Sequence, residues 1–210
     1  MCIRDRGAVA ASPARDAVDW SRVDVYWSDE RFVPVDDDER NEKQAREALL
    51  DGLPVDAGRV HPMPASDGPD GSDVQAAAAR YAGLLASLAP SDLGPDVPVL
   101  PRFDVLLLGM GPEGHTASMF PETAEVREQE RTVVPVVECP KPPPLRISLT
   151  RRAIASAEQV WLVAAGEGKA EAVARAVRGA GPVELPAAAA VGRRRSLWLL
   201  DQAAASQLKS

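Results

Sequence analysis

Phe103–Pro121, which reads FDVLLLGMGPEGHTASMFP, is the stretch that decides the fold. Its apolar start, residues 103–108, has the length and content of a buried strand. Three glycines follow at once and let the backbone turn tightly. We expect a helix to begin at His115, so that its free N–H groups attract an anion and its positive end lowers the pKa of the imidazole. This order is typical of a ligand site at the carboxyl edge of a parallel sheet.

Residues suited to an anionic substrate accompany this turn. His115 is one of only two histidines in the chain, and a neutral imidazole near pH 7 can act as a general base toward water. The glycines allow a close approach of backbone to ligand, and Thr116 adds a hydroxyl. Taken alone, a single histidine is as often a capping or hydrogen-bonded surface residue, and that alternative stays open.

A second charged motif, SDER at residues 28–31, follows an expected strand at Val23–Trp27 and is expected to form a polar loop. In a parallel sheet this loop emerges at the same edge as His115. Asp29 could then orient the imidazole, and Arg31 could bind an oxyanion or a phosphate. A solvated charged loop is the alternative reading.

The rest of the chain alternates strands and helices, which predicts an α/β fold. We expect a doubly wound, mostly parallel sheet with helices on both faces. Residues 1–22 carry little pattern beyond a short helix at 8–17, and residues 23–210 read as one domain. The expected helices are 41–50, 73–88, 151–157, 167–178 and 203–208, and the expected strands are 23–27, 103–108, 132–137, 146–149, 160–165 and 197–200. Pro135 places its strand near a sheet edge, because proline cannot donate to the ladder.

The composition disfavours several classes of protein. A chain of 210 residues with 45% hydrophobic content can bury a core. Its formal net charge of −7 argues against a nucleic-acid-binding face. Two cysteines make neither a disulfide framework nor a metal site, so we expect a cytoplasmic protein without a metal. No apolar run approaches the roughly 20 residues that a membrane span needs.

GMGPEG, residues 109–114, also matches the G-x-G-x-x-G fingerprint of dinucleotide-binding folds. Two prolines argue against a nicotinamide cofactor. Pro121 would end the expected helix after about six residues, too early for the usual crossover, and Pro112 removes an N–H that could face a pyrophosphate. A tight turn without any ligand is the other alternative.

Several motifs together resemble the 6-phosphogluconolactonase family. They run in order over almost all of residues 23–205: WSDERFVP (27–34), Asn41 with REALL (46–50), LLLGMGPEGHTASMFP (106–121), PKPPPLRISLT (140–150), GEGKAEAV (166–173) and WLLD (198–201). GHTASMFP is the most specific, because related sugar-phosphate isomerases differ after the same Gly-His. The resemblance implies a Rossmann-like fold similar to that of glucosamine-6-phosphate deaminase.

The resemblance also implies an activity, the hydrolysis of 6-phospho-D-glucono-1,5-lactone to 6-phospho-D-gluconate in the pentose phosphate pathway. No cofactor, metal, nucleic acid or membrane is expected, and we expect a monomer. Carried over by position, His115 is the general base, Asp29 its supporting carboxylate, and Arg31 a substrate contact. The expected substrate-binding and phosphate-binding residues are Gly111, Gly114, Thr116, Arg146, Lys169 and Asn41.

The chain departs from the family pattern at two places. Glu113 stands where the family usually has Asp, which keeps the charge and adds one methylene. Family members also begin with a strand, a helix and a second strand that leads into a Gly-Gly-Ser-type phosphate loop. No Gly-Gly occurs in this chain, so we expect this amino-terminal part to be missing or replaced and phosphate binding to be weaker.

Two other functions stay open at this point. One is a glucosamine-6-phosphate deaminase-like isomerase, whose chemistry needs a carboxylate base near C2 of the sugar. The sequence TASMFP after the Gly-His argues against it. The other is a non-catalytic sugar-phosphate-binding domain.

Overall fold

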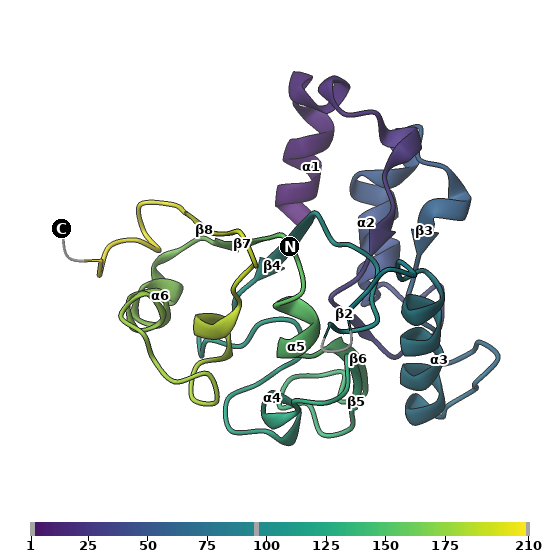
Figure 1. Cartoon of the computed structure of the whole chain (residues 1–210). Coiled ribbons are helices and arrows are strands. Elements are labelled where there is room, and N and C mark those ends of the chain that lie inside the picture. Colours follow the sequence, from purple (N-terminus) through teal and green to yellow (C-terminus); the bar gives the residue numbers. More distant parts are fainter. Residues whose placement is uncertain (1–2, 95–96, 209–210) are drawn as a thin grey trace.

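The structure is a computed structural model that describes residues 3–94 and 97–208. Within these residues the strands form a parallel sheet, an antiparallel sheet and a separate two-stranded pair (Figure 1). The parallel sheet has the order β4 (Val105–Gly109), β7 (Gln159–Ala164) and β8 (Arg195–Leu200). The antiparallel sheet has the order β2 (Asp29–Arg31), β6 (Arg146–Leu149) and β5 (Val133–Val136). β1 (Val25–Tyr26) pairs in parallel with β3 (Val60–His61).

Helices alternate with these strands along the chain, which confirms the predicted α/β class. The α-helices of the described residues are α1 (Ile3–Ala11), α2 (Asn41–Ala48), α3 (Val74–Ser87), α4 (Ala124–Arg127), α5 (Arg151–Ile154) and α6 (Ala170–Val177). α3 packs against β5 and β6, whereas α6 lies beside the parallel sheet at the other end of the molecule (Figure 1).

The central strands of the two larger sheets are the most deeply buried. In β7 the side chains alternate, and Val160, Leu162 and Ala164 point into the core. All four residues of β6 are buried, since this strand has a neighbour on each side and packs against α3. β5 is an edge strand, as Pro135 predicts.

Local side-chain chemistry explains several helix ends. Asp73 accepts hydrogen bonds from the first-turn N–H groups of Gln75 and Ala76, which caps α3. Thr150 caps α5 as predicted, by accepting from the N–H of Ala153. Gly179, at φ +88°, follows the end of α6, and the predicted stop there is confirmed.

The predictions for both ends of the chain are wrong in part. Residues 202–207 form turns instead of the helix expected at 203–208, although the Asp201 carboxylate accepts from the N–H groups of Ala204 and Gly166. So short a segment has little tendency to nucleate a helix. The helix expected at 8–17 is instead α1, followed by a 3₁₀ turn over Pro13–Ala17.

Candidate active site

His115 lies in a tight turn that leaves β4, and no helix begins there. The N–H of Gly111 donates to the His115 carbonyl (2.9 Å), and the N–H of Gly114 donates to the Gly111 carbonyl (3.0 Å). Gly114 and Ala117 have φ values of +90° and +49°, which a right-handed helix does not allow. The predicted helix is therefore wrong, and the next helix, α4, begins only at Ala124.

The glycines of this turn bring backbone and imidazole together. A Cβ built on Gly111 would overlap the His115 ring, so only glycine leaves room for the imidazole there. At Gly114 a Cβ would lie 2.5 Å from Cγ of Leu185, and the positive φ already favours glycine. Thr116 closes the turn, because its hydroxyl donates to the Gly109 carbonyl (2.9 Å).

Asp29 and Arg31 reach this turn by a route that differs from the predicted one. They belong to a strand, β2, and not to a loop at the edge of the parallel sheet. β2 pairs antiparallel with β6, so that Asp29 lies opposite Ser148 and Arg31 opposite Arg146. The loop prediction is wrong because Glu30, between them, is fully buried and commits this charged segment to the sheet. Alternation places Asp29 and Arg31 on the same face of that sheet.

Ser118 connects the histidine turn to this sheet face. Its hydroxyl donates to Oδ2 of Asp29 (2.8 Å) across 89 residues of sequence, and its N–H donates to Oγ of Ser148 (3.1 Å). Asn41 stabilises the same strand, because its side-chain amide donates to the backbone carbonyl of Asp29 (3.0 Å). His115 and Asp29 are thus brought together, and Asn41 holds the backbone that carries Asp29.

The His115 imidazole is packed between an aromatic ring and a carboxylate. It stacks on Phe120 with ring centroids 4.2 Å apart. Nδ1 is buried and lies 3.1 Å from Oε1 of Glu113, outside the geometry of a hydrogen bond. The same Glu113 oxygen lies 2.6 Å from Nζ of Lys141. With Nδ1 covered in this way, Nε2 is the nitrogen available to water or substrate.

Burial lowers the pKa of His115 below its ordinary value of 6.5. The Glu113 and Asp29 carboxylates oppose this shift, and the Lys141 ammonium adds to it. The imidazole is therefore neutral at pH 7. Its side chain is 19% exposed, so a water molecule can reach it. A neutral, accessible imidazole is the state that a general base requires.

Arg31 and Arg146 face one another across β2 and β6 but have different partners. Two cations directly opposite in a sheet repel unless other groups balance them. Arg31 donates from Nη1 to the Glu39 carbonyl (2.6 Å), while its buried Nε has no partner. Arg146 instead donates from Nε and Nη2 to the carbonyls of residues 141–143. Arg31 therefore binds backbone through one nitrogen, whereas Arg146 does so through two.

Lys169 also comes to the histidine turn. It lies in a 3₁₀ turn after β7, and its ammonium donates to the carbonyl of Met110, next to Gly111. Of the residues predicted for the site, the turn residues, Asp29 and Lys169 thus gather around His115. Arg31 and Arg146 lie along the adjoining sheet face.

Sequence reasoning did not single out three residues that shape this site. Ser148 could have been found, because it lies two positions after Arg146 in a predicted strand and so shares its face. Phe120 stacks on His115 because the turn folds back, and Lys141 reaches the Phe120 ring from a more distant segment. No local pattern signals such contacts.

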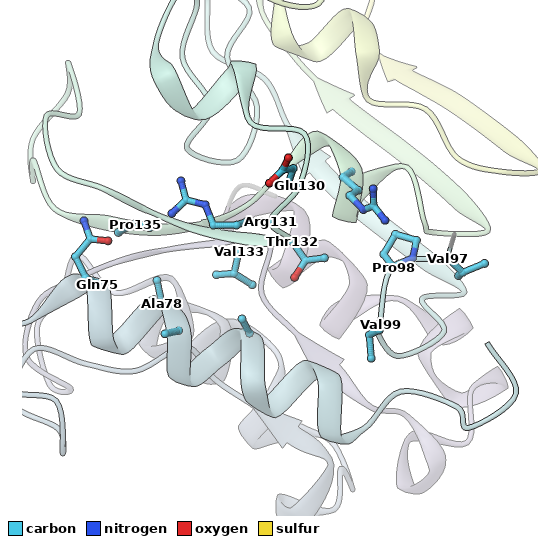
Figure 2. Close-up of a pocket in the computed structure, with 13 residues that line it drawn as sticks. Gln75, Ala78, Val97, Pro98, Val99, Glu130, Arg131, Thr132, Val133 and Pro135 are labelled. Atoms are coloured by element: carbon cyan, nitrogen blue, oxygen red, sulfur yellow. The ribbon is translucent and has the colours of Figure 1, made fainter. Parts of the chain in front are cut away.

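A separate groove of about 610 Å³ lies between α3 and β5 (Figure 2). Ala78 of the helix and Val133 of the strand form part of its floor, and Val97 and Val99 form one side. Its lining contains no histidine and none of the predicted site residues. We therefore assign the candidate active site to the surroundings of His115 and not to this groove.

Within residues 3–94 and 97–208, none of the helices is both long and apolar enough to cross a membrane. No group of three or more His, Cys, Asp and Glu side chains in the same residues is arranged to hold a metal ion.

Comparison with known proteins finds the same combination of fold and motifs elsewhere. The sequence model of the family described as glucosamine-6-phosphate isomerases/6-phosphogluconolactonase matches residues 6–198. A 6-phosphogluconolactonase of Streptomyces coelicolor is 61% identical over 201 residues, which cover 96% of this chain and 76% of that protein. A 6-phosphogluconolactonase of Mycobacterium tuberculosis is 55% identical over 194 residues, covering 92% and 76% of the two chains.

Solved structures agree with the sequence relatives. The 6-phosphogluconolactonase of Trypanosoma brucei superposes with a TM-score of 0.80 at 28% identity, over 99% of this chain and 82% of that one. A monomeric glucosamine-6-phosphate deaminase has a TM-score of 0.72 at 21% identity, over 97% of this chain and 81% of that one. The predicted Rossmann-like, deaminase-like fold is therefore confirmed.

Proposed function

The chain belongs to the glucosamine-6-phosphate isomerase/6-phosphogluconolactonase family, and from that premise we propose that His115 is its general base. Relatives at 55% to 61% identity are named 6-phosphogluconolactonase. The chain is accordingly a lactone-hydrolysing enzyme, which opens 6-phospho-D-glucono-1,5-lactone to 6-phospho-D-gluconate in the pentose phosphate pathway.

The proposed reaction begins with a water molecule at Nε2 of His115. The neutral imidazole takes a proton from this water as its oxygen attacks the lactone carbonyl carbon. The carbonyl π bond becomes an oxyanion on a tetrahedral carbon. When the oxyanion collapses, the bond to the ring oxygen breaks, and the imidazolium returns its proton to that oxygen. No covalent enzyme intermediate is needed, because the lactone is already electrophilic.

Charge on the substrate calls for cationic partners. Within residues 111–115, the amides of Gly111 and Gly114 are poor candidates for the oxyanion because they bond within the turn, and Pro112 has no N–H. Arg31 suits the oxyanion better, because its charged side chain is 24% exposed and lies on the sheet face that carries Asp29. We assign the phosphate to the positive charge of Arg146 and Lys169, near the backbone of Gly111, Gly114 and Thr116.

One observation carries this assignment. Ser118 ties the histidine turn to Asp29 through a 2.8 Å hydrogen bond, so that a neutral imidazole and a carboxylate from distant parts of the chain share one site. Asp29 then stabilises the imidazolium that forms during the reaction.

The test is a rate measurement on His115→Gln. We expect lactone hydrolysis above the spontaneous rate to fall about 10²-fold or more, because the general base is lost. His61→Gln is the matched control, since it removes the only other histidine, which lies in β3 and binds Asp24. A His115→Gln enzyme as fast as the wild type would contradict the proposal.

We further propose that the enzyme acts as a cytoplasmic monomer without a nucleic-acid partner. The net charge of −7 disfavours binding to polyanions such as nucleic acid. A sedimentation measurement that finds a stable dimer would contradict the first part.

A further inference from the structure

We propose that Lys141 is a positioning residue for His115: its ammonium, carried on a segment that Arg146 holds in place, keeps Glu113 against the buried nitrogen of the imidazole. The inference deepens the proposed function and rests on the role of His115 given there.

The first support is the position of one Glu113 carboxylate oxygen, which lies between the Lys141 ammonium and the His115 imidazole. Oε1 of Glu113 lies 2.6 Å from Nζ of Lys141 and 3.1 Å from Nδ1 of His115. A carboxylate beside Nδ1 favours the tautomer that carries its proton there, which leaves Nε2 free to accept one. Glu113 alone could rotate into solvent, because its side chain is 34% exposed. The ammonium on its other side opposes that rotation.

The second support is the packing of the same lysine on the aromatic ring behind the imidazole. Nζ of Lys141 lies 5.8 Å from the centre of the Phe120 ring, within reach of a cation–π interaction. Phe120 in turn stacks on His115 and packs with Val136 and Cys139 in a small buried cluster. Lys141 therefore contacts both groups that fix the plane of the imidazole.

The third support is the way in which the lysine is held. Arg146 is only 5% exposed, and its guanidinium donates to the carbonyls of Lys141 (3.1 Å), Pro142 (3.1 Å) and Pro143 (3.2 Å). A planar guanidinium that binds consecutive carbonyls fixes the path of that segment. Because Arg146 itself belongs to β6, the position of Lys141 is set by the sheet that carries Asp29 and Arg31.

The charged groups that act on His115 come from three separate elements. They are Glu113 of its own turn, Lys141 of the segment before β6, and Asp29 of β2. Replacing Lys141 by a neutral residue removes the only cation of the three. Two carboxylates then face the imidazole, so the His115 pKa rises. Without its ammonium partner Glu113 is also less fixed, and the preference for a proton on Nδ1 weakens.

The experiment is a ¹⁵N NMR titration of the imidazoles in the wild type and in Lys141→Met. The chain has two histidines, and His115→Gln identifies their signals. We expect the titration of His115 to move to higher pH in Lys141→Met and its Nδ1–H tautomer to become less dominant. His61, which binds Asp24 and Tyr26, serves as the internal reference and stays unchanged. Lys141→Arg, which keeps the charge, is expected to restore most of the wild-type behaviour.

Kinetics provide the second readout. In Lys141→Met we expect kcat to fall about tenfold with little change in KM, because the base is misplaced while substrate contacts remain. An unchanged titration and tautomer of His115 in Lys141→Met would overturn the inference, whatever the activity. A shifted titration in an enzyme that hydrolyses no lactone would support the positioning role and reject the proposed function.

Discussion

His115 is held by groups that push its ionisation in opposite directions. Burial favours the neutral ring, the Glu113 and Asp29 carboxylates favour the imidazolium, and the net effect lowers the pKa. A base in this state is ready to accept a proton at neutral pH, and the nearby carboxylates stabilise the charge once it has formed.

This balance predicts the pH dependence of the reaction. A general base works only when it is neutral, so activity is lost as the pH falls through the folded-state pKa of His115. Because that pKa is lowered from 6.5, the acid limb of kcat/KM should have its midpoint below 6.5, with a plateau at neutral pH. The rates are measured with the spontaneous hydrolysis of the lactone subtracted at each pH. A midpoint at or above 6.5 would contradict the described environment of the ring.

At this scale the sequence singled out the residues proposed to react more readily than the residues that surround them. His115, Asp29 and Arg31 could be chosen because their chemistry is carried by residue type and short motifs. The roles of Lys141 and Phe120 could not, since each depends on contacts between segments that are distant in the sequence or on the way a turn folds back. Arg146 was correctly seen as a strand cation, but its engagement with backbone carbonyls follows only from coordinates.

At the scale of elements, Glu30 joins β2 to α2. Arg40, the residue before α2, does not cap the helix with its side chain. The Glu30 carboxylate, which belongs to β2, caps it instead. Oε1 accepts from the N–H groups of Asn41 and Arg31 (2.7 Å each), and Oε2 accepts from the N–H of Glu42 (2.8 Å). Burial raises the pKa of Glu30, while Arg40 and these three N–H groups oppose the shift.

We predict that Glu30→Ala lowers the free energy of unfolding by about 3–5 kcal/mol, because it leaves buried donors and the buried Arg40 without this carboxylate. Urea unfolding followed by circular dichroism measures the change. Glu122→Ala, which removes an exposed ion pair with Arg127, is the matched control and should stay within about 1 kcal/mol. Equal losses in the two variants would show that Glu30 does not anchor these elements.

Most elements could be predicted because their signals are local. The strand at 146–149 has the predicted bounds, and α3 lies within its predicted range, since apolar spacing and caps decide both. The sequence did not predict β2, because three consecutive charged residues are not typical of a strand. Its pairing with β6 and the burial of Glu30 are decided by packing that no local pattern contains.

At the scale of the whole molecule, the site lies where the parallel and antiparallel sheets meet. The turn after β4 leaves the parallel sheet, and Ser118 bonds it to β2 and β6 of the antiparallel one. The sequence predicted the α/β class from the alternation of elements. It could not predict the division into sheets, because strand direction depends on which distant segments pair.

The most direct test of this shared site is an NMR titration of the two histidine imidazoles with 6-phosphogluconate, the product of the reaction. We predict that the His115 signals shift and saturate while those of His61 do not, and that Arg31→Gln weakens binding roughly 10-fold or more, since it removes a charged hydrogen-bond donor. Saturable binding by calorimetry that leaves the His115 signals unchanged would contradict the account.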